Sequence, residues 1–157
     1  MKIKNKNQQA IVEWVNNSKT KFNYAATLTF PNDTSSQEQA KKICNQFCNF
    51  YNSELGYKNY KRKVIHDKTK AAAIYASLEG DGQVQDYHYH LALYKPENIP
   101  DWKFELLVKD CWKRATFSGF CKTDVKPMTS IGWTTYITKQ VSSTNTDSLD
   151  EINTNIH

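Results

Sequence analysis

The sequence contains no apolar run of about 18 residues, so it predicts no membrane-spanning helix. Residues 1–9 are basic and polar and include no hydrophobic segment, so no secretory signal is predicted and we expect a cytoplasmic protein. The four cysteines show no metal-type pairing, which favours a reducing compartment. No Gly-x-x-x-x-Gly-Lys-Ser/Thr sequence occurs, so the chain holds no P-loop helicase.

Basic residues are also absent from residues 141–157, which carry three acidic residues. The other 13 of the 16 acidic residues and all 21 basic residues lie in residues 1–140, whose net charge is therefore +8. A basic domain favours a polyanionic partner, and an aromatic content of 13% can supply stacking surfaces for unpaired bases. Because residues 141–157 are rich in Ser, Thr, Asn and Asp, we expect a flexible polar tail or linker after one domain at residues 1–140.

Hydrophobic periodicity predicts an α+β fold. Strands are expected at residues 24–30, 71–79, 87–94 and 119–125, and helices at residues 10–15, 35–54, 102–115 and 131–140. A capping box of Ser35 and Glu38 begins the second helix. Residues 80–86 are rich in Gly and Asp and predict a hairpin loop between two of the strands. We therefore expect a mixed or antiparallel central sheet with helices on one face.

Two of the four histidines, His88 and His90, lie one residue apart in a predicted strand. Residues i and i+2 of a strand point to the same face, so these imidazoles would project side by side. If the strands that flank the hairpin loop pair with each other, Glu79 lies beside His88. Two imidazoles and one carboxylate suit an octahedral divalent ion that keeps positions for water or substrate. Asp81 and Asp86 are alternative carboxylates at the same hairpin.

A tyrosine and a lysine, Tyr136 and Lys139, lie three residues apart in the last predicted helix and would share one face of it. A tyrosine hydroxyl is a poor nucleophile at its usual pKa of about 10. A metal ion that polarises an attacked phosphate lowers the barrier, and a nearby lysine can hold the phosphate or favour the phenolate. Taken alone, the pair is also compatible with an aromatic core residue followed by a surface lysine. With the histidines, it predicts metal-assisted nucleophilic attack on a phosphodiester.

Residues 57–70 are basic and aromatic, and an exposed strand within them is one expectation. We expect the cations of this stretch to hold the backbone of a nucleic acid, through Lys58, Lys61, Arg62 and Lys63. The alternative is a solvated basic loop.

Three of these features follow one another in the order found in the HUH endonucleases. The chain resembles the single-tyrosine replication initiator (Rep) nuclease domains of that superfamily. Residues 26–30 are similar to their apolar-Thr strand, His88-Tyr89-His90 to their His-hydrophobic-His motif, and residues 136–139 to their Tyr-x-x-Lys motif. Tyr89 is aromatic where the second motif more often has a small aliphatic residue. The position of Glu79 resembles that of an upstream glutamate that completes the metal site in related initiators.

The resemblance implies a ferredoxin-like, HUH-type sheet flanked by helices and a nuclease that uses Mg²⁺ or Mn²⁺. It implies that Tyr136 attacks single-stranded DNA at an origin, which can be a hairpin, and keeps a 5′-phosphotyrosine link. The freed 3′-hydroxyl primes rolling-circle replication, and reversal of the step rejoins ends. His88, His90 and Glu79 would hold the metal, and Lys139 would assist. A helicase, as a further domain or from the host, is the expected protein partner.

Alternatives remain at the level of function. Single-tyrosine HUH transposases of small insertion elements share two of the motifs, but many have glutamine where this chain has Lys139. Relaxases are usually larger and use three histidines. From other classes, the chain could be a non-catalytic single-stranded nucleic-acid-binding domain with stacking aromatics, or an interaction domain with no nucleic-acid role. Metal-dependent cleavage of a labelled single strand distinguishes a nuclease from both.

Overall fold

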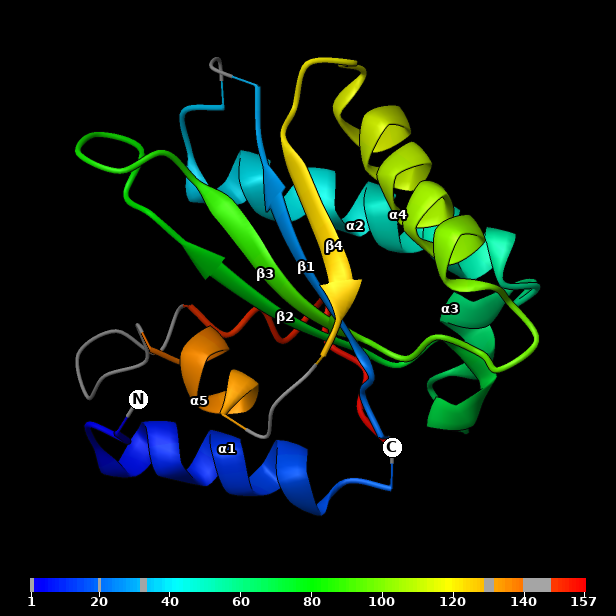
Figure 1. Cartoon of the computed structure of the whole chain (residues 1–157), viewed down its shortest axis with the longest axis horizontal. Coiled ribbons are helices and arrows are strands. Elements are labelled where there is room, and N and C mark those ends of the chain that lie inside the picture. The colour runs from blue at the N-terminus through cyan, green and yellow to red at the C-terminus, as the bar shows by residue number, and fades with distance from the viewer. Residues whose placement is uncertain (1, 20, 32–33, 129–131, 140–147) are drawn as a thin grey trace.

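The computed structural model describes residues 2–19, 21–31, 34–128, 132–139 and 148–157. Its centre is an antiparallel sheet of four strands in the order β2-β3-β1-β4 (Figure 1). The strands are β1 (Tyr24–Thr29), β2 (Ile74–Glu79), β3 (His88–Leu93) and β4 (Thr123–Pro127). The predicted α+β class is confirmed, and so is the hairpin, because β2 and β3 pair directly.

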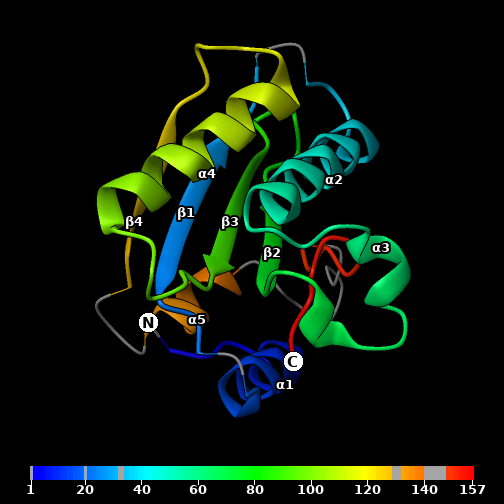
Figure 2. The same cartoon turned by 90° about the vertical axis from the view of Figure 1, so that its right-hand side faces the viewer.

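Helices lie on both faces of this sheet (Figures 1 and 2). The α-helices of the described residues are α1 (Lys6–Asn17), α2 (Gln37–Glu54), α3 (Tyr60–Lys63), α4 (Asp101–Thr116) and α5 (Trp133–Ile137). The main core lies under α2 and α4, and a second cluster on the opposite face joins Tyr75 and Ala92 to Ile137 of α5. The expectation of helices on one face is therefore wrong, because β2 is buried along its whole length and both of its faces need cover. None of the described helices is long and apolar enough to cross a membrane.

The alternation of side chains along β3 separates the core from the candidate site. Tyr89, Leu91 and Leu93 enter the main core under α2 and α4. His88 and His90 therefore point to the opposite face, where α1 and α5 lie. Because side chains alternate along β3, one set of residues packs into the core and the other set places both imidazoles on the opposite face.

Helix α2 begins one residue later than the predicted capping box. Ser36 is the N-cap, and its hydroxyl accepts a hydrogen bond from the Gln39 backbone N–H at 3.1 Å. The Gln39 side chain reaches back to the Ser35 backbone N–H, also at 3.1 Å. Glu38 is not part of the cap, because its carboxylate pairs with Lys42 at 2.7 Å one turn along the helix.

The basic stretch at residues 57–70 contains no strand. It forms α3 and a 3-10 turn at Lys68–Lys70. It packs against α2, where the Tyr60 hydroxyl donates a hydrogen bond to Asn49 at 2.7 Å and the Lys61 ammonium donates one to Asn45 at 3.2 Å. These contacts hold the stretch on the face of the sheet opposite to the histidines.

Residues 148–157, here called the C-terminal strap, run along the free edge of β2. Leu78 donates its backbone N–H to the Ser148 carbonyl at 2.7 Å, and Ile74 and Asn155 exchange both backbone hydrogen bonds. The expectation of a flexible tail is therefore wrong for these residues. Their polar composition satisfies the edge of a strand, which would otherwise leave backbone groups unpaired. Residues 141–147 of the predicted tail lie outside the described residues.

A buried carboxylate anchors the C-terminal strap. Asp150 is only 1% exposed. It accepts a hydrogen bond from the Tyr89 hydroxyl at 2.5 Å and one from the Asn153 side-chain amide at 2.6 Å. This contact explains why an aromatic residue stands between the two histidines, since the Tyr89 ring fills the core and its hydroxyl fastens the strap.

Asp150→Ala should lower the free energy of unfolding by about 2–3 kcal/mol, because it leaves the Tyr89 hydroxyl buried without an acceptor. Urea denaturation at neutral pH measures the change. Glu151→Ala removes the carboxylate of an exposed neighbour and should leave stability within about 0.5 kcal/mol of the parent. Equal losses in the two variants would contradict the anchoring role of Asp150.

Candidate active site

Glu79, His88 and His90 come together where β2 ends and β3 begins. Glu79 and His88 are cross-strand partners, as the hairpin predicted. The Nε2 atoms of His88 and His90 lie 3.2 and 3.4 Å from Glu79 Oε2, and the ligand atoms of all three residues lie within 4.8 Å of one another. Neighbouring ligands of an octahedral ion with bonds of about 2.1 Å lie about 3 Å apart. This buried cluster could therefore hold a metal ion.

Two atoms of the cluster are buried without a hydrogen-bond partner among the described residues. They are Glu79 Oε1 and His90 Nε2, and their residues are 0% and 3% exposed. Buried polar atoms in proteins nearly always have a partner, so each such atom calls for an explanation. A metal ion bound between these side chains would be a partner for His90 Nε2, and it would also be one for Glu79 Oε1 where the carboxylate binds through both oxygens.

Hydrogen bonds behind the imidazoles fix how they face Glu79. His88 Nδ1 lies 3.0 Å from the Asp86 carbonyl oxygen, and because a carbonyl only accepts, Nδ1 carries the proton. His90 Nδ1 lies 3.1 Å from the Thr27 hydroxyl. Both Nε2 atoms therefore face the carboxylate, an arrangement typical of metal-binding histidines. Thr27 was not among the predicted site residues, although it lies in the apolar-Thr strand that the resemblance includes.

The alternative carboxylates do not join the cluster. The Asp81 carboxylate accepts hydrogen bonds from the backbone N–H groups of Gln83, Val84 and Gln85 at 2.9 to 3.0 Å and so holds the hairpin loop together. Asp86 takes part through its backbone carbonyl. Among the described residues, Glu79 is the carboxylate that meets the histidines.

The electrostatics of the cluster keep its carboxylate ionised. Burial alone would raise the pKa of Glu79, but His88, His90 and Lys139 around it lower that pKa to about 2. The hydrogen bond with Glu79 raises the pKa of His88, against the effect of burial. The Glu79 carboxylate is thus ionised at any pH above about 4.

The segment around α5 brings Tyr136 and Lys139 to the same place. The Tyr136 ring centre lies 5.2 Å from that of His90, and the residue is 39% exposed. The Lys139 ammonium lies 3.0 Å from Glu79 Oε2 and 4.2 Å from the centre of the Tyr136 ring. The predicted tyrosine and lysine are therefore brought together with the predicted metal ligands. Lys139 lies in the turn that follows α5, and residues 131 and 140 of the predicted helix lie outside the described residues.

Contacts with α1 and the second cluster hold α5 in position. Gln8 of α1 is buried, and its side-chain amide donates hydrogen bonds to the Thr135 carbonyl at 3.1 Å and to the Thr138 hydroxyl at 3.3 Å. Ile137 is fully buried in the second cluster. Because these anchors flank Tyr136, its ring is held against His90 while one side stays open to solvent.

Other tyrosines near the histidines in sequence are differently placed. Burial, together with the neighbouring Cys44 and Asp150, raises the pKa of Tyr89 far above its usual value, so it stays protonated in the core. Tyr94 follows the opposite end of β3. The Tyr87 ring packs over Gly82, where an added Cβ would come within 2.7 Å of it. Among the tyrosines in the described part of the chain, only Tyr136 makes a ring contact with either histidine.

The four cations predicted to hold DNA are not brought to this site. Helix α3 precedes β2 and packs against α2. The four cations lie in this helix or beside it, namely Lys58, Lys61, Arg62 and Lys63. Glu79 ends β2, and the five steps of about 3.3 Å between the six residues of that strand separate its two ends by about 17 Å. The expectation that these residues bind DNA stays a prediction.

Comparison with known proteins gives no relative for this chain. No protein family matches it, no curated protein matches it, and no solved structure matches it. The functional argument therefore depends on the geometry of the site and on the motifs in the sequence.

Proposed function

We propose that this protein is a metal-dependent endonuclease that nicks and rejoins single-stranded DNA through a 5′-phosphotyrosine link. The main support for the proposal is the contact of the partly exposed Tyr136 ring with His90, beside a cluster that could hold a metal ion. The order of the three motifs along the chain supports the same reading. As in replication initiators of the HUH superfamily, the expected biological step is the initiation of rolling-circle replication.

Glu79, His88 and His90 would hold the divalent ion, which would supply Lewis acidity toward a phosphate oxygen. The Tyr136 oxygen attacks the phosphorus, and the bond from phosphorus to the 3′ oxygen breaks. The phosphate then joins Tyr136 to the 5′ side of the break, and the proton lost by the phenol is balanced by the one gained by the 3′ oxygen. The Lys139 ammonium, which lies 4.2 Å from the centre of the Tyr136 ring, would stabilise negative charge on the attacked phosphate. Attack by the 3′-hydroxyl reverses the step.

We propose Mg²⁺ or Mn²⁺ as the metal and expect Mn²⁺ to bind more tightly. Two of the three ligand atoms are imidazole nitrogens, whereas Mg²⁺ prefers an all-oxygen set. One carboxylate and two imidazoles would hold such an ion and would leave room beside it for water and phosphate.

The simplest test of the proposal is incubation of the purified chain with a pool of random single-stranded DNA and Mn²⁺. We expect a protein–DNA adduct that survives boiling in detergent and that does not form when EDTA is present. A domain that only binds nucleic acid gives retention on native gels in both conditions and no adduct in either. Binding without any adduct would contradict the proposed enzymatic activity.

Lys139→Ala should raise the affinity for Mn²⁺ on the order of tenfold, because it removes a positive charge next to the ion. The same variant should nick DNA more slowly while the adduct still forms on Tyr136, since the lysine assists and forms no bond. Titration calorimetry measures the first effect and single-turnover nicking the second. Lys109→Ala, an exposed lysine of α4 on the other face, is the matched control. An unchanged Mn²⁺ affinity in Lys139→Ala would mean that no ion lies beside this ammonium.

Removal of the four charges at Lys58, Lys61, Arg62 and Lys63 should weaken binding of all single strands alike. Each lost phosphate contact lowers the slope of log affinity against log salt by about one. Anisotropy titrations over a range of salt concentrations give this slope. If the slope equals that of Lys109→Ala, the basic stretch is a solvated surface and not part of the DNA path.

A further inference from the structure

Two phenylalanines in the loop between α4 and β4 are almost entirely exposed. Phe117 is 94% exposed and Phe120 is 98% exposed. Scattered apolar side chains on a surface are common, but two whole aromatic rings in one short loop of a chain of this size are not. We name residues 117–120 the aromatic loop.

Hydrogen bonds in and beside the aromatic loop order its backbone. The Phe120 backbone N–H donates to the Ser118 hydroxyl at 3.2 Å. The Thr116 hydroxyl donates to the Trp112 carbonyl at 2.9 Å and lies 3.4 Å from the Ser118 carbonyl. The loop is thus held in one shape that presents both rings to solvent.

The backbone of Phe117 is also in a conformation that favours glycine. Its φ is +52°, in the left-handed region, at the C-terminal end of α4. Glycine is the usual residue at such a helix end, and a bulky side chain there is strained. Strain of this kind is retained at sites where the side chain has a role.

The aromatic loop lies at the end of the sheet that holds the candidate active site (Figure 1). The Lys122 carbonyl accepts a hydrogen bond from the Thr29 backbone N–H at 3.1 Å, and Thr29 is the cross-strand partner of His88. Two strand spacings separate Lys122 from His88, and Phe120 precedes Lys122 by two residues. The backbone of Phe120 is therefore about 10 to 15 Å from that of His88. A strand of DNA covers this separation with a few nucleotides.

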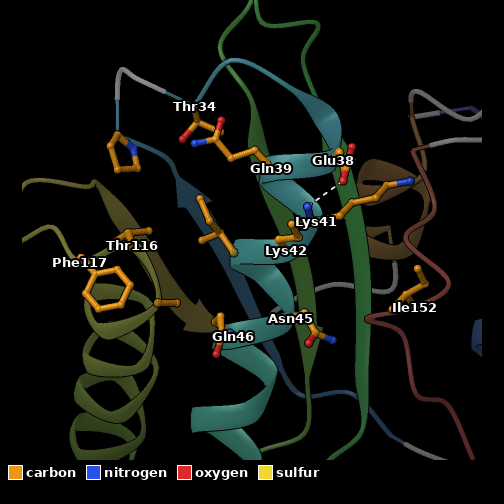
Figure 3. A pocket seen from close by; sticks show the side chains of 13 residues that line it. Thr34, Glu38, Gln39, Lys41, Lys42, Asn45, Gln46, Thr116, Phe117 and Ile152 are labelled. Atoms are coloured by element: carbon orange, nitrogen blue, oxygen red, sulfur yellow. Dashed lines mark ion pairs between the residues drawn. The ribbon is translucent and has the colours of Figure 1, made fainter.

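The surroundings of the loop are cationic on one side and rich in hydrogen-bonding groups on the other. Lys113 and Lys122 are exposed, and in the described part of the chain neither forms an ion pair. Phe117 also borders a hollow along α2, where Gln39 and Gln46 are among the polar residues that line it (Figure 3). Exposed rings beside unpaired cations and amide groups suit unpaired bases of a nucleic acid, which present flat faces next to phosphates and polar edges.

From these observations we infer that Phe117 and Phe120 form a stacking platform for unpaired bases of the DNA strand that enters the active site. The inference rests on the proposed function for the identity of its partner, which is single-stranded DNA. In this inference the aromatic loop binds the bases by stacking, and Tyr136 is the nucleophile.

Binding of a fluorescein-labelled oligodeoxythymidine to the full chain in EDTA tests the inference without any nicking. Phe120→Ala should weaken binding roughly tenfold to a hundredfold, the range expected for one lost base stack. Phe120→Leu keeps apolar area but not the flat ring, so it should lose nearly as much. Trp102→Ala is the matched control, because Trp102 is 65% exposed at the other end of α4 and its loss should not change affinity.

Oligonucleotides with single abasic positions locate the stack. At the position that stacks on Phe120, removal of the base should weaken binding by the parent and make no further difference to Phe120→Ala. Phe117→Gly should raise the melting temperature by roughly 2–4 °C, since glycine relieves the strain, and should still weaken DNA binding. A purely structural residue would not show this opposite pair of effects.

Unchanged DNA affinity in Phe120→Ala would overturn the inference. So would loss of self-association or of vesicle binding in that variant with DNA affinity retained, because the platform would then serve a protein or lipid partner. The outcomes also separate the two proposals. If the parent forms an adduct at Tyr136 and Phe120→Ala binds DNA normally, only the stacking platform is contradicted. If no adduct forms but DNA binding depends on the Phe120 ring, only the nuclease activity is contradicted.

Discussion

Replacement of both His88 and His90 by alanine should lower metal-dependent cleavage of single-stranded DNA by more than about a hundredfold. Two of the three candidate ligand atoms are lost, and among the described residues Glu79 then retains Lys139 as its ion-pair partner. Calorimetry should detect no Mn²⁺ binding in the concentration range that saturates the parent. The variant should still bind single strands, because the exposed cations and aromatic rings are unchanged.

The matched control for this variant is His66→Ala, since His66 is exposed in the segment between α3 and β2, away from the cluster. Circular dichroism and the melting temperature without metal show whether the double variant keeps its fold. The single variants give the same information with smaller structural change, and each should lose cleavage. Undiminished cleavage by a folded double variant would remove the metal from the mechanism.

Tyr136→Phe should abolish the covalent DNA adduct and leave DNA affinity within about twofold of the parent. The substitution keeps the ring, its contact with His90 and its contact with Lys139, and deletes only the oxygen that would attack. Because Tyr136 is partly exposed, loss of the hydroxyl should change the free energy of unfolding by less than about 0.5 kcal/mol.

Tyr94→Phe is a close control, because Tyr94 has the same exposed fraction of 39% and follows the far end of β3. It should form the adduct at the rate of the parent. If Tyr136→Phe still forms an adduct, the nucleophile is a different residue. If it loses DNA binding as well as the adduct, Tyr136 acts in substrate binding and its assignment as nucleophile lacks support.

Short-range patterns in the sequence were enough to predict the centre of the fold and the cluster. Side chains alternate between the two faces along β3, so His88 and His90 lie on one face whichever strands pair with β3. The hairpin loop then fixes Glu79 opposite His88, because β2 and β3 are adjacent in sequence. Tyr136 and Lys139 depend on a longer contact between α5 and the sheet, and for them the motif order supplied what local periodicity could not.

The structure could not be predicted from local sequence patterns where hydrogen bonds join residues that are far apart in the chain. The polar C-terminal strap resembles a tail in composition, and only the free edge of β2 and the buried Tyr89 hydroxyl show what its polar groups bind. Thr27 orients His90 through the register of β1 against β3, which no local pattern reveals. The exposure of Phe120 was likewise not predicted, because the sequence placed this residue in a strand at residues 119–125, whereas β4 begins at Thr123.

The most direct measurement is mass spectrometry of the protein after reaction with single-stranded DNA and Mn²⁺. The adduct is isolated in denaturing conditions, digested with protease and nuclease, and mapped by fragmentation of the modified peptide. We expect a phosphonucleotide linked through its 5′-phosphate to Tyr136, and a free 3′-hydroxyl on the released strand. Absence of a covalent adduct, or an adduct on Tyr87, Tyr89 or Tyr94, would contradict the proposed mechanism.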